Sequence, residues 1–294
     1  MSTFEEPTMQ HHPAIAPGRT AVVTGGASGI GLAAGKRFAS LGLNVVLADL
    51  AGDALDAARA AVMMAASAAG ATDPSAAVRA VPTDVGRMDD MRVLKETAYE
   101  AFGDVAVLMN NAAISPVGKP WDAYGDWQRL LATNLWGVIN GVQAFAPALL
   151  EAGKPAAIVN TGSKQGITTP PGNAAYNVSK AGVKAFTEAT AYELRETPNC
   201  AVTAHLLIPG FTFTGLTNAS EKPAAAWTAE QVVAFMLDAM ASGDFYILCP
   251  DNDVDRATDE KRMAWAMGDV IENRPALSRW HPDFKDAFAR HMAG

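Results

Sequence analysis

The sequence predicts an α/β protein built on a mainly parallel, doubly wound sheet of seven strands, with helices on both faces. Short apolar runs of strand-like composition alternate with longer helix-like segments along most of the chain. This alternation is typical of parallel strands that are joined by crossover helices. Because such crossovers are right-handed, ligand sites are expected at the carboxyl ends of the strands.

The expected elements follow one another without an internal repeat or a long linker. The strand-like runs occupy residues 20–25, 44–49, 77–82, 105–113, 156–162, 200–208 and 245–250. Helices are expected over 29–40, from beyond the second strand to about Ala68, and over 87–102, 122–152, 174–196 and 228–242. The turn-forming run "GATDPS" ends the second of these helices.

Length and composition favour one large, well-buried domain that forms oligomers. Of the 294 residues, 49% are hydrophobic and only 18% are charged, against about 25% charged in an average soluble protein. We expect residues 1–18 to form a flexible tail, 19–250 the domain, and 251–294 a helical extension. The extension either caps the substrate pocket or packs on another subunit or on itself, and packing on a subunit or on itself is favoured. Its expected apolar face consists of Trp265, Met267, Trp280 and Phe284.

Several function classes are disfavoured by the same composition. The net charge of −8 and the lack of a Lys/Arg cluster disfavour nucleic-acid binding. No apolar run reaches the length of about 18 residues that would span a bilayer, and the N-terminus lacks the apolar segment of a signal peptide. The only two cysteines, Cys200 and Cys249, indicate a reduced, cytoplasmic setting. The five histidines show no metal-ligand spacing, so no metal is expected.

A glycine-rich turn connects the first strand to the first helix. The run "TGGASGIG", from Thr24 to Gly31, spaces its glycines as Gly25-x-x-x-Gly29-x-Gly31. Glycines at such a turn let the backbone approach a pyrophosphate, which the helix N-terminus attracts electrostatically. A plain glycine turn is the alternative, but its place between strand and helix favours a nucleotide site.

The second strand ends in a carboxylate, Asp49, eighteen residues after Gly31. A carboxylate at this position can accept hydrogen bonds from the adenosine ribose hydroxyls and repel a 2′-phosphate. No Lys or Arg occurs in the glycine turn or directly after Asp49. We therefore expect NAD in preference to NADP, with capping of the next helix as the minor alternative for Asp49.

A tyrosine and a lysine one helical turn apart, Tyr176 and Lys180, form a Tyr-x-x-x-Lys pair. Free tyrosine titrates near pH 10 and is a poor base at neutral pH. A neighbouring ammonium favours the phenolate and brings the tyrosine pKa toward the range useful for proton transfer. The pair alone is a weak motif, and Tyr176 could equally be a core aromatic.

Taken in order, these motifs resemble those of the short-chain dehydrogenase/reductase family from about Arg19 to Pro250. Ser163 precedes Tyr176 by thirteen residues, a separation common in the family. "NNAA" matches the family's Asn-Asn-Ala-Gly, with Ala113 in place of the usual glycine. The other matching motifs are "TGGASGIG", Asp84 in "PTDV", Asn134 in "ATNLWGV" and "PGFTFT" at 209–214.

The resemblance implies a Rossmann-type domain that moves hydride between a nicotinamide cofactor and a secondary alcohol or ketone. The implied catalytic residues are Asn134, Ser163, Tyr176 and Lys180. The implied cofactor contacts are Gly25, Ser28, Gly29, Ile30, Gly31, Asp49, Leu50, Asp84, Val85, Asn111, Ala112, Tyr176, Lys180, Pro209, Gly210, Thr212 and Thr214.

In these roles Tyr176 is the acid/base and Ser163 hydrogen-bonds the substrate oxygen. Lys180 also holds the nicotinamide ribose, and Asn134 holds a water that links Lys180 to solvent. The resemblance further implies a homodimer or homotetramer.

The substrate side is mostly apolar, which favours a hydrophobic or aryl alcohol or ketone. Its expected contacts are Ser163, Gln165, Tyr176 and Phe211. Lys164 is expected to be exposed, with contact to an anionic substituent as the alternative. A serine hydrolase is disfavoured because "NTGSKQG" lacks the nucleophile-elbow pattern. A non-catalytic NAD-binding regulator or scaffold remains the second function hypothesis.

Overall fold

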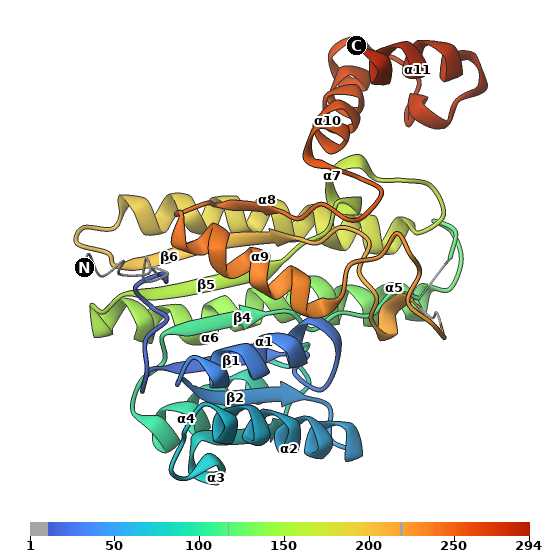
Figure 1. Ribbon diagram of the computed structural model, residues 1–294. Helices are drawn as coiled ribbons and strands as arrows, with labels where there is room; N and C mark the ends of the chain where they lie inside the picture. Colours follow the sequence, from blue (N-terminus) through green and yellow to red (C-terminus); the bar gives the residue numbers. More distant parts are fainter. Residues whose placement is uncertain (1–10, 117, 218–219) are drawn as a thin grey trace, which may run out of the picture.

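A seven-stranded parallel sheet organises the computed structural model, which describes residues 11–116, 118–217 and 220–294. The strand order is β3-β2-β1-β4-β5-β6-β7, with the direction of winding reversed between β1 and β4 (Figure 1). Adjacent strands pair in parallel register, for example Val22 with Leu108 across β1 and β4. The strands are β1 Thr20–Thr24, β2 Asn44–Asp49, β3 Val78–Pro82, β4 Val107–Asn110, β5 Ala156–Thr161, β6 Val202–Ile208 and β7 Tyr246–Leu248.

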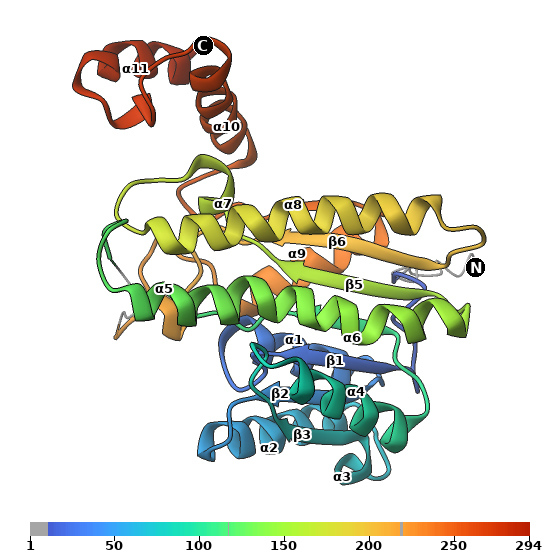
Figure 2. The same cartoon turned by 180° about the vertical axis from the view of Figure 1, so that it is seen from behind.

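Helices cover both faces of the sheet, as expected. One layer holds α1, α2 and α9, and the opposite layer holds α4, α6 and α8 (Figures 1 and 2). Glycine in the left-handed conformation ends α4 at Gly103 and α6 at Gly153. The principal helices are α1 Gly29–Ser40, α2 Asp53–Ala68, α4 Met88–Phe102, α5 Tyr124–Leu131, α6 Gly137–Ala152, α8 Ala174–Glu196 and α9 Ala229–Ala241.

The hydrophobic core is divided by the sheet into two large clusters. Valines of β1 and β2 point alternately into the two layers: Val23 and Val45 face α1 and α2, whereas Val22 and Val46 face the α4 side. Because both faces are buried, these strands are apolar throughout, which is why their sequence identified them so clearly.

Two expected elements differ in detail from the structure. The strand expected over 105–113 is β4, which ends at Asn110 because Asn111 turns away to bind the side chain of Thr24. The single helix expected over 122–152 is interrupted by a π-helical segment, Ala132–Trp136, between α5 and α6. Short helices occur at α3, Pro74–Ala77, and α7, Gln165–Thr168.

The tail expected at residues 1–18 is wrong for its second half, whereas residues 1–10 lie outside the described part of the chain. Ala14 and Ile15 are buried in the core cluster beside α1. His12 is 7% exposed, and its Nε2 lies 3.2 Å from Thr203 Oγ1, which in turn lies 2.9 Å from His205 Nε2. Apolar burial and this polar chain hold the segment against β6.

The C-terminal arm, residues 251–294, stands off the domain beside α7 (Figure 1). It contains α10 Arg256–Ile271 and α11 Lys285–Ala293, with short 3₁₀ turns between them. Of the expected apolar face, Trp265 is buried inside the arm, whereas Met267 and Trp280 are exposed. None of the helices in the described ranges has the length and apolar character needed to cross a bilayer.

We expect the burial of His12 beside His205 to make the free energy of unfolding fall as the pH is lowered. Burial, aided by His205, lowers the pKa of His12 from 6.5 to about 4. The unfolded chain therefore takes up the proton first, and the stabilisation is lost as the pH falls from about 6.5 to about 4. In thermal unfolding, His12→Gln should show a smaller drop in Tm over this range than the wild type.

His281→Gln, which alters a half-buried histidine of the arm, is the control and should keep the wild-type pH dependence. An unchanged slope in His12→Gln would contradict the assignment.

Candidate active site

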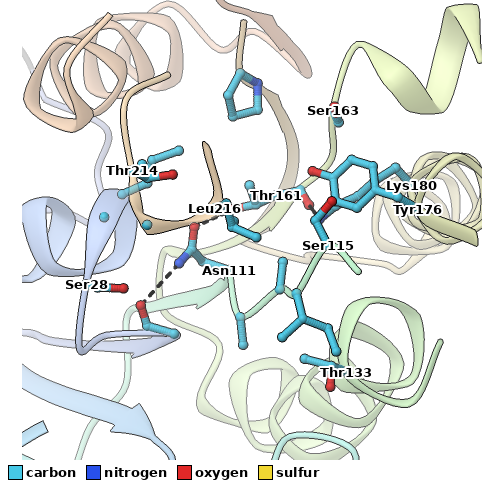
Figure 3. Close-up of a pocket in the computed structure, with 18 of the residues that line it drawn as sticks. Ser28, Asn111, Ser115, Thr133, Thr161, Ser163, Tyr176, Lys180, Thr214 and Leu216 are labelled. Atoms are coloured by element: carbon cyan, nitrogen blue, oxygen red, sulfur yellow. Dashed lines mark hydrogen bonds between the residues drawn. The ribbon is translucent and has the colours of Figure 1, made fainter. Parts of the chain in front are cut away.

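A cleft of about 1020 Å³ runs along the carboxyl ends of the strands. This volume is at the upper end of the range of about 300–1,000 Å³ for small-molecule sites. Most residues proposed from the sequence line it, and several are seen in Figure 3. The predicted residues in the lining are Gly25, Ser28, Gly29, Ile30, Asp49, Leu50, Asp84, Val85, Asn111, Ala112, Ser163, Gln165, Tyr176, Lys180, Pro209, Gly210, Phe211, Thr212 and Thr214.

The glycine turn is packed so closely that larger residues would not fit. A Cβ on Gly25 would lie 2.8 Å from Ala112 Cα, and one on Gly31 would lie 2.1 Å from the Gly25 carbonyl oxygen. Gly29 has a positive φ of 53°. Gly31 thus packs behind the turn, and Gly25 and Gly29 leave backbone facing the cleft, the arrangement a pyrophosphate requires.

Asn111 fastens the ends of three strands beneath the cleft. Its backbone N–H donates to Thr24 Oγ1 at 2.9 Å, and its Nδ2 donates to the Thr24 carbonyl at 3.2 Å. Its Oδ1 accepts from Thr161 Oγ1 at 3.3 Å. Because β1, β4 and β5 meet here, Asn111 also fixes the spacing between the glycine turn and the Ser163 loop.

Two carboxylates lie at the adenosine end expected for a dinucleotide. Asp49 accepts from the backbone N–H of Ala27 at 2.9 Å and of Leu50 at 2.8 Å. The alternative role for Asp49, capping α2, is wrong because Gly52 is the N-cap residue. Asp84 accepts from the Gly86 N–H at 2.9 Å. Both carboxylates are thus held in fixed positions at the cleft.

The side chain of Asn134 lies behind the cleft rather than in its lining. It is 0% exposed, accepts from the Ile114 N–H at 2.8 Å, and donates to the Ile114 carbonyl at 2.9 Å and to Ser179 Oγ at 3.3 Å. Asn134 belongs to the π-helical segment, a feature that is frequent at functional sites. Its side chain therefore positions the loop after β4.

Tyr176, Ser163 and Lys180 converge at the other end of the cleft (Figure 3). Lys180 is 2% exposed, donates to the Thr161 carbonyl at 2.7 Å, and places Nζ 5.6 Å from the centre of the Tyr176 ring. Burial lowers the pKa of Lys180 to about 8. Burial also raises the pKa of Tyr176, which a hydrogen bond with Ser163 only partly offsets, so the expected lowering of this pKa by Lys180 is wrong for the structure as it stands.

The structure adds lining residues that the sequence did not suggest, among them Thr133, Thr161 and Arg129. Ser115 also lines the cleft, and its Oγ accepts from Asn173 Nδ2 at 2.9 Å, which ties the loop after β4 to the start of α8. Thr161, the last residue of β5, could have been found from its place at a strand's carboxyl end. Thr133 and Arg129 line the cleft because of helix packing, which no local pattern in the sequence indicates.

The expectation that Lys164 is exposed is wrong, although Lys164 is among the residues that line the cleft. Its side chain is 16% exposed and forms ion pairs with Asp251 and Asp259. Within the ranges that the structure describes, no group of three or more His, Cys, Asp or Glu side chains could hold a metal ion. Cys200 and Cys249 are free.

Comparison with known proteins agrees with this geometry. The family described as short chain dehydrogenase matches residues 19–225. A 1-deoxy-11-beta-hydroxypentalenate dehydrogenase of Streptomyces exfoliatus is 34% identical over 89% of this chain and 94% of its own. A 3-alpha-(or 20-beta)-hydroxysteroid dehydrogenase of Mycobacterium tuberculosis is 33% identical over 91% of this chain and 93% of its own.

Solved structures show the same fold with either cofactor. A short-chain dehydrogenase/reductase from Burkholderia phymatum in complex with NAD has a TM-score of 0.77 at 31% identity, covering 88% of this chain and 96% of its own. A metagenomic short-chain oxidoreductase in complex with NADP has a TM-score of 0.64 at 26% identity, covering 80% and 98%. The chain belongs to the short-chain dehydrogenase/reductase family and is an oxidoreductase of that family.

Proposed function

We propose that the protein is an NAD(H)-dependent dehydrogenase that interconverts a hydrophobic or aryl secondary alcohol and the corresponding ketone, with Tyr176 as the acid/base. The observation that carries this proposal is the convergence of Tyr176, Ser163 and a buried Lys180 at one end of a cleft that has a glycine turn at the other. A non-catalytic dinucleotide-binding protein would not require this set of side chains together.

The roles of the side chains follow from their positions. Ser163 and Tyr176 both present hydroxyl groups to the cleft, so they can hydrogen-bond one substrate oxygen. A nicotinamide held at this end of the cleft by Tyr176 and Lys180 would supply the hydride acceptor for oxidation and the hydride donor for reduction. Tyr176 then takes the hydroxyl proton in oxidation and donates it in reduction. The Lys180 ammonium stabilises the phenolate form of Tyr176, in which the tyrosine lacks its proton.

The glycine turn supports dinucleotide binding, because α1 begins without an acidic residue in its first turn. Its first backbone N–H groups are therefore suited to an anionic pyrophosphate. Preference for NAD is supported by Asp49, whose fixed carboxylate would repel a 2′-phosphate. The contacts proposed for the adenosine, pyrophosphate and nicotinamide portions are the cleft residues named from the sequence, with Gly31 packed behind the turn.

An uncharged, apolar substrate is supported by the substrate end of the cleft. Ile114, Pro116, Phe211 and Leu216 line it beside a few polar groups such as Gln165. The charge on Lys164 is matched by two buried carboxylates, so it offers no free cation to an anionic substrate. The hydroxysteroid dehydrogenase among the relatives is consistent with a bulky apolar ligand.

We also propose a cytoplasmic homodimer or homotetramer, with residues 19–250 as the catalytic domain and 251–294 as an extension. Exposed apolar side chains on the outer helices, such as Val178 on α8 and Leu150 on α6, support self-association.

Removal of the Tyr176 hydroxyl tests the acid/base assignment. We expect Tyr176→Phe to lower kcat/KM for alcohol oxidation by about 10²- to 10⁴-fold, the usual contribution of such a group, while NADH binding measured by fluorescence is nearly unchanged. Tyr192→Phe, on the exposed face of the same helix, is the matched control. If Tyr176→Phe keeps wild-type turnover, Tyr176 is not the acid/base. A wild type that binds NADH tightly but turns over no alcohol would favour the non-catalytic alternative.

The two reaction directions should depend oppositely on pH. Below a pH of about 8, the pKa of Lys180, the ammonium is present and Tyr176 holds its proton. Ketone reduction, which needs that proton and the ammonium, should slow above this pH. Alcohol oxidation, which needs the pair to release a proton, should accelerate through the same range. Profiles of kcat/KM in both directions check this, and parallel profiles would contradict it.

Neutralising Asp49 tests the cofactor preference. Asp49→Asn keeps the shape of the side chain but removes the charge that would face a 2′-phosphate. We expect the ratio of kcat/KM for NADP to that for NAD to rise by about tenfold or more, since juxtaposed like charges cost several kcal/mol. Asp53→Asn, on the exposed first turn of α2, is the control. A wild type that prefers NADP would refute the role given to Asp49.

A further inference from the structure

Three charged side chains from distant parts of the chain meet beside the substrate end of the cleft. Lys164 follows Ser163 directly, Asp251 begins the C-terminal arm, and Asp259 lies on the first turn of α10. Lys164 Nζ lies 2.5 Å from Asp259 Oδ2 and 3.5 Å from Asp251 Oδ2. We call these three residues the Lys164 ion cluster.

The Lys164 ion cluster is withdrawn from water. The side chains of Lys164, Asp251 and Asp259 are 16%, 6% and 4% exposed. Burial of charges is unfavourable unless they are paired and hydrogen-bonded, and removal of one partner leaves the others uncompensated. The relative positions of the segments that carry these charges are therefore restricted more strongly than an exposed ion pair would restrict them.

The loop after β6 is attached to one of these carboxylates, Asp251. Asp251 Oδ2 accepts from the backbone N–H of Phe211 at 3.1 Å, in addition to its ion pair with Lys164. A Cβ on Gly210 would lie 2.9 Å from Asp251 Oδ2 and 3.0 Å from Lys164 Nζ. The loop after β6 thus packs directly against the cluster, and glycine at position 210 permits this approach.

We propose that Lys164 is a positioning residue that fixes the Ser163 loop and the Gly210–Phe211 loop against the start of the C-terminal arm, and so sets the geometry of the substrate end. The proposal rests on the proposed function, because it assigns Ser163 and Phe211 to the substrate. Lys164 acts through Asp251 and Asp259, not by touching the reacting atoms. The arm is thereby coupled to substrate binding even though most of it stands away from the cleft.

A purely structural brace would lower thermal stability and leave the kinetic parameters of the folded enzyme unchanged. A positioning role instead predicts a selective kinetic effect, because small displacements of groups that orient a substrate lower the rate strongly. The effect should be larger in kcat/KM for the alcohol than in the affinity for NADH. The loop after β6 carries some of the proposed cofactor contacts, among them Gly210, but most of them lie at the glycine turn and the adenosine end of the cleft.

The test compares Lys164→Met, Asp259→Asn, their combination and Lys164→Arg with the wild type. Lys184→Met is the matched control, since Lys184 forms an ion pair with Glu188 at 2.7 Å on the outer side of α8. Each protein is measured for Tm, NADH affinity, kcat and KM for an alcohol that the wild type oxidises. Hydrogen exchange is followed in peptides that cover residues 160–168 and 206–216.

We expect Lys164→Met to lower kcat/KM for the alcohol by about ten- to hundredfold with NADH affinity within about twofold, and to speed exchange in both peptides. Asp259→Asn should act in the same direction, and the combined variant should be no worse than Lys164→Met alone, because the two residues share one interaction. Lys164→Arg should recover most of the activity, and Lys184→Met should resemble the wild type.

Two outcomes would overturn the proposal. Wild-type kinetics and wild-type hydrogen exchange in Lys164→Met would mean that the Lys164 ion cluster has a structural role only. An unaffected Asp259→Asn beside an impaired Lys164→Met would contradict the coupling of Lys164 to α10 through Asp259. Exchange is measured whether or not the protein turns over an alcohol, so failure of the proposed function and failure of this coupling are distinguishable.

Discussion

The site depends on one unfavourable placement, a lysine ammonium buried beneath the cleft with a carbonyl as its hydrogen-bond partner. Lys180 is 2% exposed and donates to the Thr161 carbonyl, and burial alone accounts for the lowering of its pKa to about 8. The same burial raises the pKa of Tyr176. Both groups therefore titrate away from their ordinary values: Lys180 gives up its proton more readily, and Tyr176 holds its proton more tightly, than the same group in water. An exposed pair would titrate near its ordinary values and would lack this property.

The fold supplies the rigid surroundings that such a placement requires. Thr161 ends the central strand β5, and Lys180 and Tyr176 share one face of the 23-residue helix α8. Asn134, through its bonds to Ile114 and Ser179, connects the loop after β4 to that helix. Asn111 connects β1, β4 and β5 below the same point. Each of these bonds joins residues far apart in the chain, so the site forms only when the strands of the parallel sheet have assembled.

The sequence could predict what depends on local patterns and on fixed spacings. All seven strands were anticipated, as were the bounds of α8 and the residues of the glycine turn, because apolar runs and glycine spacing are local signals. The π-helical segment at Asn134 was not anticipated, since its apolar periodicity is close to that of the flanking α-helices. The burial of Ala14 and the ion pairs of Lys164 were also missed, because both depend on tertiary packing, in the case of Lys164 with carboxylates about 90 residues away. The charge of Lys164 suggested that its side chain would be exposed, whereas its pairing with two carboxylates makes its burial possible.

The internal packing of the C-terminal arm explains how its contacts with α7 and Lys164 can pass a displacement of the arm to the loop that carries Ser163. Trp265 donates to Ser278 Oγ at 2.8 Å, and the Arg274 guanidinium lies 4.0 Å from the centre of the Trp265 ring. Asp269 bonds both Ser278 and Arg274. Because α10 and the turns that follow it are braced by these interactions, the arm is suited to move as one body. A displacement anywhere along it would then reach α7 and Asp259 at the base of α10, where the Lys164 ion cluster connects to the loop that carries Ser163.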